Sequence, residues 1–382
     1  MWKLIKRILA IIFVSTLTFE LLSAGSVHLG VVSANAPSYV WPSFTPFWAA
    51  TDRHFGMWHP PHAHFNHVKA CYNLVYNTNA DGARDKERPL KAPGRRVAVL
   101  GDSFVEGYGL ADADRVSDRL EAETGMPHLN FGTSGGFGPT QYFLQYKSLV
   151  KKFTHEAVII NILPDNDFGD DDPAVAEARQ DSRYAPYFHT TDQGYDLRYR
   201  NADKLGPAEK TVRKAWKQGL RSVLRSFSYG ANAIDYFKAM ITYQRSMDRS
   251  LPGGEKAYSG YFDFTGEQWR RMAFVVNQIL GAANGKPVVF TLIPRPNDIR
   301  RAKSGSAAHQ SATMRTPLAA AFGDLLNGRP NTALIDFLDG FSKLADPAPM
   351  YNKCDGHWSP AGAALAAKIL LASGFYRREV QR

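Results

Sequence analysis

The feature that most constrains this fold is a series of short, continuous apolar runs that alternate with segments of helical spacing. The apolar runs are residues 96–100, 128–131, 157–163, 286–293 and 332–337. The helical segments are residues 113–123, 140–153, 267–283 and 318–326, with a last helix that opens at Pro360. Apolar runs without polar alternation predict strands buried on both faces, as in parallel sheets. We therefore predict the α/β class: a three-layer α/β/α sandwich with a mainly parallel central sheet.

The chain length and one interruption of this pattern indicate more than one structural unit. A chain of 382 residues exceeds the size that a single hydrophobic core normally serves. Residues 168–265 break the alternation, because they are polar, rich in Tyr and Arg, and interrupted by Gly and Pro. We expect a main domain at residues 95–382, an inserted cap subdomain within it at about residues 168–265, and an extended N-terminal segment at residues 37–94.

The first residues of the chain carry a targeting signal. Three basic residues precede an apolar stretch at residues 8–19, Glu20 interrupts the stretch, and residues 21–32 are again mostly apolar. A basic flank followed by an apolar run predicts export, with the basic flank left in the cytoplasm. Residues 1–36 are either a signal peptide, cut after Ala34-Asn35-Ala36, or a retained signal anchor. The protein is expected in the periplasm, or anchored in a membrane and facing the periplasm or exterior.

Charge and cysteine content limit the partners that we expect. The formal net charge is +10, but the Lys and Arg residues are scattered, and no zinc-finger spacing or RNA-binding signature is present. We therefore expect no nucleic-acid partner. Cys71 and Cys354 cannot build a metal cluster alone, and they either pair in an oxidising compartment or remain two buried thiols. The four histidines within residues 59–67 are expected in a packed loop, because no acidic or cysteine ligand joins them.

Four polar motifs follow predicted strands or open a predicted helix. They are Gly101-Asp102-Ser103, the Gly-rich segment 130–136, Asn166-Asp167 and Asp355-Gly356-His357. Right-handed crossovers bring the carboxyl ends of parallel strands to one edge of the sheet, where open α/β folds bind ligands. Each motif alone is weak evidence, since turn serines, glycine loops, turn asparagines and capping aspartates are common. Their shared position predicts one site at that edge.

In type and order, these motifs resemble the blocks of the SGNH (GDSL) hydrolase superfamily, in its exported form. The resemblance implies an SGNH/flavodoxin-like sandwich in which Ser103 is the nucleophile, His357 its base and Asp355 the residue that orients the imidazole. It also implies an oxyanion hole formed by the Ser103 N–H, the Gly135 N–H and the Asn166 side chain. The resemblance implies no metal and no organic cofactor.

The resemblance covers about residues 79–375, apart from the insertion, and two blocks depart from the usual pattern. Pro164 stands where Gly is common, and the last block reads D-x-H instead of D-x-x-H. The implied function is a serine-dependent ester hydrolase, an O-acyl (acetyl) esterase on an extracytoplasmic carbohydrate. Two alternatives remain: an O-acetyltransferase that modifies a cell-envelope or secreted polysaccharide, and a non-catalytic glycan-binding protein. Aromatic residues such as Trp48 and Tyr187 are expected to pack in the core more often than to stack on sugars. The oligomeric state is left open.

Overall fold

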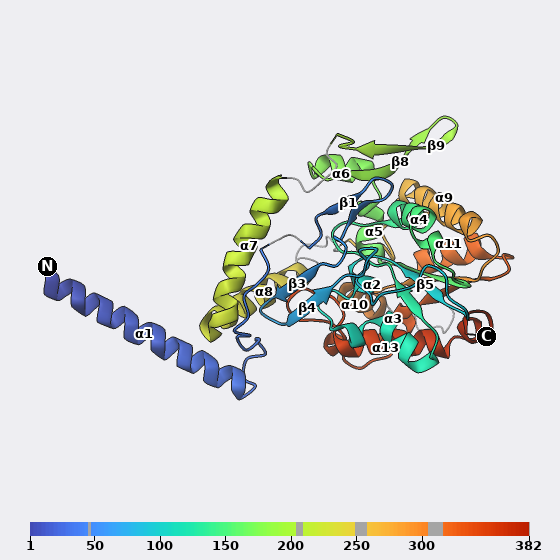
Figure 1. Cartoon of the computed structure of the whole chain (residues 1–382). Coiled ribbons are helices and arrows are strands. Elements are labelled where there is room, and N and C mark those ends of the chain that lie inside the picture. Colours follow the sequence, from blue (N-terminus) through green and yellow to red (C-terminus); the bar gives the residue numbers. More distant parts are fainter. Residues whose placement is uncertain (45–46, 204–208, 249–257, 305–315, 382) are drawn as a thin grey trace.

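The structure, a computed structural model, describes residues 1–44, 47–203, 209–248, 258–304 and 316–381. Its centre is a five-stranded parallel sheet with the strand order β11-β10-β7-β5-β6 (Figure 1). The strands are β5 (Val97–Leu100), β6 (His128–Asn130), β7 (Ala157–Ile162), β10 (Val288–Leu292) and β11 (Thr332–Asp336). Every residue of the first four is buried, as strands covered on both faces require. The predicted α/β class with a parallel central sheet is confirmed.

Helices cover both faces of the sheet (Figure 1). One layer holds α3 (Val116–Thr124), α12 (Phe337–Ser342) and α13 (Pro360–Ala372), and α13 contacts both of the others. The opposite layer holds α4 (Pro139–Ser148), α9 (Gly266–Ala283) and α11 (Pro317–Leu326). The last long helix opens at Pro360, as its sequence predicts, and the Ser359 side chain caps it by accepting a hydrogen bond from the Gly362 N–H.

Short helices follow the carboxyl ends of the inner strands, and they position the polar motifs. α2 (Ser103–Glu106) follows β5, α5 (Pro164–Asp170) follows β7, and α10 (Pro296–Ser304) follows β10. The remaining short elements are α6 (Pro173–Ala178), the 3-10 turns Asp112–Asp114, Val150–Lys152 and Ala348–Met350, and a π turn at Tyr376–Val380. Because each inner strand runs straight into one of these helices, the residues at the strand ends gather at one edge of the sheet.

The N-terminal segment, residues 37–94, contains two antiparallel hairpins. β1 (Ala50–Asp52) pairs with β2 (Gly56–Trp58), and β3 (His64–Val68) pairs with β4 (Asn73–Asn77). The sequence pattern did not reveal these short strands. Arg84 fixes the segment to the sheet domain, because its fully buried guanidinium donates to carbonyl oxygens at the end of α2 and in the turn that follows.

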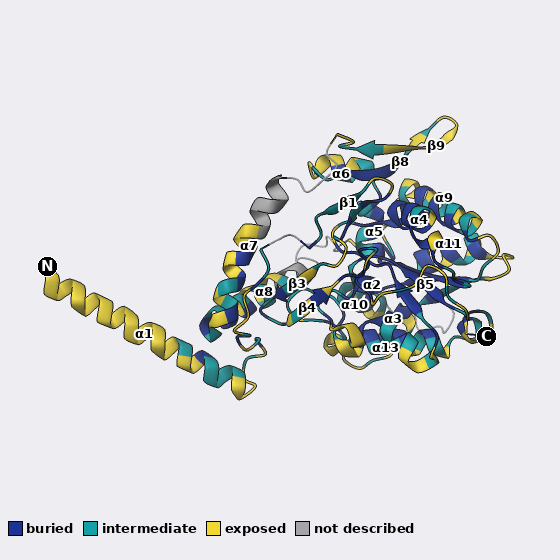
Figure 2. Ribbon diagram, in the orientation of Figure 1, coloured by how far each residue is buried: buried dark blue, intermediate teal, exposed yellow. Residues whose placement is uncertain are grey.

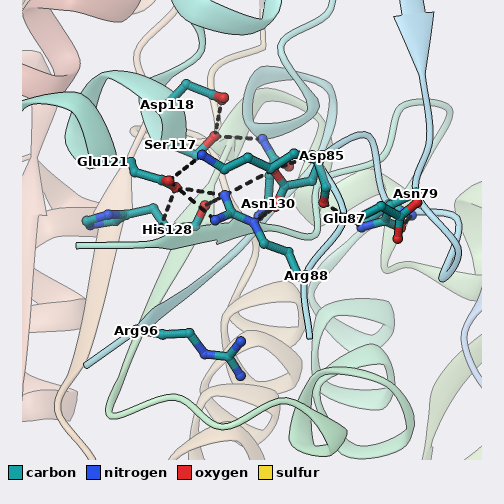
Figure 3. A network of polar contacts seen from close by, with 12 residues as sticks. Asn79, Asp85, Glu87, Arg88, Arg96, Ser117, Asp118, Glu121, His128 and Asn130 are labelled. Atoms are coloured by element: carbon teal, nitrogen blue, oxygen red, sulfur yellow. Dashed lines mark hydrogen bonds and ion pairs between the residues drawn. The ribbon is translucent and has the colours of Figure 1, made fainter. Parts of the chain in front are cut away.

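A polar network beside Arg84 joins the same segment to β6 and α3 (Figure 3). Asp85 Oδ2 accepts a hydrogen bond from the Asn130 N–H at 3.1 Å. Arg88 donates to Asp85, and its Nη2 atom also donates to Glu121 Oε2 at 2.7 Å. The segment is therefore held to the end of β6, where the Gly-rich segment 130–136 begins.

Residues 168–265, the predicted insertion, contain a hairpin and two long helices. β8 (Ala185–Thr191) pairs with β9 (Gly194–Arg200), α7 spans Glu209–Phe227, and α8 spans Tyr229–Asp248. Residues 204–208 and 249–257 of this prediction lie outside the described residues. β8 contacts α4 and β2, and α7 contacts β3. The region therefore packs against the N-terminal segment as well as against the sheet domain.

The first helix, α1 (Trp2–His28), projects from the body of the molecule, and most of its surface is exposed (Figures 1 and 2). Among the described residues it is the one helix long and apolar enough to cross a membrane, a property that signal sequences share. Cys71 and Cys354, whose pairing the sequence left open, form a disulfide with their Cα atoms 6.2 Å apart. The apolar helix and the disulfide together indicate export or membrane anchoring.

Candidate active site

Ser103 lies on the turn between β5 and α2. The preceding Asp102 is buried and caps α2, because its Oδ1 atom accepts a hydrogen bond from the Phe104 N–H at 3.0 Å. The turn requires glycine at position 101, because a Cβ atom there would lie 2.4 Å from a methyl carbon of Val105. The turn thus places the Ser103 side chain at the carboxyl edge of the sheet.

The structure brings Ser103 and His357 together, although 254 positions separate them in the chain. His357 Nε2 lies 2.9 Å from Ser103 Oγ, within hydrogen-bonding distance. The imidazole packs against the ring of Tyr108, with centroids 4.6 Å apart, and against the ring of Phe104, with centroids 5.1 Å apart. Such a contact between a serine hydroxyl and an oriented imidazole is what a base needs to remove the hydroxyl proton.

Asp355 lies on the other side of the imidazole. Its Oδ1 atom is 3.2 Å from His357 Nδ1, within ion-pair distance but without the alignment of a hydrogen bond. The same carboxylate accepts hydrogen bonds from the His357 backbone N–H and from Tyr72 Oη, each at 3.1 Å. Burial raises the pKa of Asp355, but the contacts with His357 and Tyr72 outweigh burial and hold this pKa below its ordinary value. Asp355 is therefore a carboxylate beside the imidazole.

Gly135 and Asn166 line the same cavity as Ser103 and His357, with a volume of about 720 Å³. Gly135 has a φ of +107°, in the left-handed region that favours glycine. The Asn166 Nδ2 atom donates to Asp102 Oδ2 at 3.3 Å. Its Oδ1 atom is buried and has no hydrogen-bond partner among the described residues. An amide NH2 group carries two hydrogens and the contact with Asp102 uses one, so the amide is held beside Ser103 with a second donor available.

A buried network around Glu106, which the sequence analysis missed, supports this site from behind. Glu106 lies one helical turn after Ser103 and accepts hydrogen bonds from Trp48 Nε1 at 2.8 Å and from Ser134 Oγ. His59 Nε2 lies 3.2 Å from the same carboxylate. Because Ser134 precedes Gly135, the network fixes the Gly-rich turn relative to α2. The partners of Glu106 lie far apart in the sequence, so no local sequence pattern predicts these contacts.

Several aromatic and histidine residues of the N-terminal segment and of the insertion pack in the interior, whereas His62 and His64 are exposed. Trp48 lines the cavity, whereas Trp58 and Tyr187 are buried in the interior. His59 and His67 are buried as well, and His67 packs edge-on against the rings of Tyr72, Tyr76 and Tyr108. Among the described residues, no group of three or more His, Cys, Asp or Glu side chains is placed to hold a metal ion.

Basic side chains dominate the charged lining of the cavity. The lining contains one carboxylate, that of Asp355, and five basic residues: Lys69, Arg183, Arg221, Arg225 and Arg295. Among the described residues, each of the four arginines pairs with an aspartate outside the lining, and Arg221 and Arg225 share one of these aspartates. Together with Asp355, these aspartates balance the charge of the four arginines, so the arginines contribute hydrogen-bond donors to the wall without a net charge of their own.

The geometry describes an α/β protein with a serine, an imidazole and a carboxylate at the edge of a parallel sheet. No protein-family model matches the chain, and no curated protein matches it. A solved structure from Streptococcus pneumonia, whose description refers to platelet activating factor, matches at 12% identity with a TM-score of 0.29. The match covers 74% of this chain and 85% of that chain. A similarity this low carries no argument, so membership of the SGNH superfamily stays a prediction.

Proposed function

We propose that the protein is a serine-dependent ester hydrolase, an O-acyl esterase that acts on an extracytoplasmic carbohydrate. The observation that carries this proposal is the 2.9 Å contact between Ser103 Oγ and His357 Nε2, with Asp355 beside the opposite ring nitrogen. Ester hydrolysis uses such an arrangement to turn a weakly nucleophilic hydroxyl into an attacking group. The location outside the cytoplasm rests on α1 and on the Cys71–Cys354 disulfide.

In the proposed reaction, Ser103 Oγ attacks the ester carbonyl and His357 Nε2 takes the hydroxyl proton. Asp355 balances the charge of the resulting imidazolium and limits rotation of the ring. Backbone N–H groups of Ser103 and Gly135, with the Asn166 amide, bind the oxyanion of the tetrahedral intermediate. His357 then returns the proton to the leaving alcohol, and the acyl group stays on Ser103. A water molecule, deprotonated by His357, releases the acid and regenerates the serine.

The size and the lining of the cavity support a sugar ester as the substrate. Its volume of about 720 Å³ exceeds what a short acyl group occupies, so the alcohol part of the ester also enters. The arginines on its wall can donate hydrogen bonds to the oxygen atoms of a carbohydrate. The cavity also has room for the hydroxyl of an acceptor sugar beside an acylated Ser103. This supports an O-acetyltransferase as the alternative function. Analysis of the products formed from an acyl donor with and without an acceptor glycan separates the two reactions.

Covalent trapping tests the proposal most directly. The full chain in detergent is treated with a fluorophosphonate probe, and the labelled peptide is mapped. We expect the label on Ser103, hydrolysis of p-nitrophenyl acetate by the unmodified chain, and loss of both in Ser103→Ala. Ser304→Ala, which changes an exposed serine of α10, is the control and should keep both. Equal hydrolysis by the chain and by Ser103→Ala, or a label on another residue, would refute the serine mechanism.

A further inference from the structure

Exposed apolar side chains gather on one part of the surface, next to α1. Beyond residue 31, fourteen large apolar side chains are exposed among the described residues, and ten of them lie in residues 39–41, α7 and α8. A soluble surface scatters such residues singly, and a cluster marks a contact with a protein or a membrane. Figure 2 shows exposed residues along α7, on the side of the molecule from which α1 projects.

Helix α7 is amphipathic, but its large apolar residues point away from the protein interior, whereas those of a helix packed on a core point toward it. Its small residues Gly219, Ser222 and Ser226 face inward and are buried. Its large apolar residues face outward and are exposed: Trp216, Leu220, Leu224 and Phe227. Their spacing of four, four and three positions puts them on one face of the helix. In water the apolar stripe would face the core, so this orientation fits a helix whose outer face meets lipid.

Helix α8 continues the same apolar surface. Ile234, Phe237 and Ile241 are exposed, and their spacing of three and four positions again defines one face. Trp41 and Tyr39 extend the surface beside the end of α7, where their rings lie 5.5 Å and 6.2 Å from the ring of Phe227. Tyr and Trp are the residues that membrane interfaces favour.

The turn between α7 and α8 is fixed to the last third of α1 through Glu20. One carboxylate oxygen of Glu20 accepts a hydrogen bond from the Tyr229 N–H at 2.6 Å, and the other accepts from the Gly230 N–H at 2.9 Å and from Ser228 Oγ at 2.8 Å. A Cβ atom at Gly230 would lie 2.7 Å from the ring of Phe19, so glycine permits the close approach. The one acidic residue of α1 therefore has its partners in the folded domain.

We propose that the outward face of α7 and α8, with Tyr39 and Trp41, docks on the lipid bilayer that α1 spans. In this arrangement α1 is retained as an anchor, since Glu20 holds the folded domain to it. The inward face of α7 contributes Gly219 and Ser222 to the wall of the active-site cavity. A single helix, about 10 Å across, then separates the cavity from the lipid surface.

The position of Glu20 along α1 sets the depth of this contact. A helix rises 1.5 Å per residue, so a hydrocarbon layer of about 30 Å needs about 20 residues. With Arg7 at the cytoplasmic interface, the span ends near Val27, and Glu20 lies about 10 Å below the outer interface. The turn between α7 and α8 reaches the same depth, which matches the depth of about 5–10 Å at which interfacial helices bury their apolar faces. The docking does not depend on the chemistry proposed for Ser103.

Quenching of a fluorescent label tests this docking on the full chain in lipid nanodiscs that hold one copy each. Because the native cysteines are paired, Leu224→Cys introduces one thiol for a nitrobenzoxadiazole label. Leu90→Cys is the matched control, a leucine that is also exposed but lies outside the proposed surface, and Ile12→Cys places the label within α1. We expect brominated lipid chains to quench the labels at positions 224 and 12, and aqueous iodide to quench the label at position 90 alone.

Two results would overturn the proposal. Iodide quenching at position 224 as strong as at position 90 would mean that the surface faces water. Protection of position 224 from iodide without quenching by brominated lipid would mean that protein covers the surface. A preserved disulfide and a matching circular dichroism spectrum show in each case that the labelled chain is folded.

Discussion

Reduction of the Cys71–Cys354 bond should destabilise the fold by an amount that follows from the loop it closes. The two cysteines lie 283 positions apart, so the bond encloses most of the sheet domain. For a loop of this length the chain-entropy relation gives about 5.6 kcal/mol at 25 °C, because the bond restricts the unfolded chain. Unfolding 382 residues carries an entropy of about 0.8 kcal/mol/K. The melting temperature should therefore fall by about 7 °C on reduction.

The same bond holds the loop that carries His357. Cys354 precedes Asp355 in the chain, and Tyr72, which follows Cys71, donates a hydrogen bond to that carboxylate at 3.1 Å. Reduction frees the loop from the β3–β4 hairpin and lets the imidazole leave Ser103. Turnover of p-nitrophenyl acetate at 25 °C, where the reduced chain is still folded, should fall more than the affinity for the substrate.

Calorimetry of the full chain with and without a phosphine reductant measures the shift. The double variant Cys71→Ser/Cys354→Ser is the control, because a reductant should not change its melting temperature, and it should melt near the reduced chain. A shift below about 1 °C would refute the reasoning, since the cross-link would then not restrict the unfolded chain as the loop length requires.

Three further changes test the site and its support. Asn166→Ala should lower kcat about 100- to 1,000-fold with little change in KM, because it removes one proposed oxyanion donor; an unchanged kcat would exclude that role. Burial raises the pKa of Asp171 to about 6, so the folded chain binds a proton more tightly than the unfolded chain, and stability falls as pH rises from about 4 to about 6. The Asp171→Asn variant keeps the acceptor for the Thr140 N–H and should remove about 3 kcal/mol of this fall in the free energy of unfolding. Denaturant melts at several pH values measure this free energy, and the same pH dependence in both chains would contradict the prediction. Gly132→Ala should abolish folding, because its Cβ atom would lie 2.2 Å from the backbone nitrogen of Glu106, whereas Gly281→Ala in α9 meets nothing within 4 Å and should fold; equal yields of soluble protein would disprove the clash.

The central sheet is predictable from sequence because its strands are buried on both faces. The run at residues 157–163 is apolar at nearly every position, and β7 occupies six of those seven residues. The contact between Ser103 and His357 also has a basis in sequence. One residue follows the inner strand β5 and the other precedes α13, and the connection rules of α/β folds bring such positions to one edge. The distance between their side chains needed the structure.

The rest of the site has no local signal. β3 reads His-Phe-Asn-His-Val, without the alternation of a half-buried strand, and packing against neighbouring rings fixes it instead. The contact between Glu106 and His59 joins residues 47 positions apart. Helices α7 and α8 were missed for a different reason: their apolar residues recur at helical spacing, but the polar composition of the insertion as a whole obscured that pattern.

The site also depends on residues that precede the sheet domain, and a cut at residue 95, the start of the predicted main domain, would expose that dependence. Arg84 satisfies carbonyl oxygens around the turn that follows α2, and without it these buried acceptors lose their donors. Arg88 neutralises Glu121, which lowers the pKa of that carboxyl to about 2. Tyr72 and Cys71 hold the loop of His357. The sheet domain therefore supplies the serine and the imidazole, while the N-terminal segment keeps them in contact, and the two must fold together for the proposed activation of Ser103.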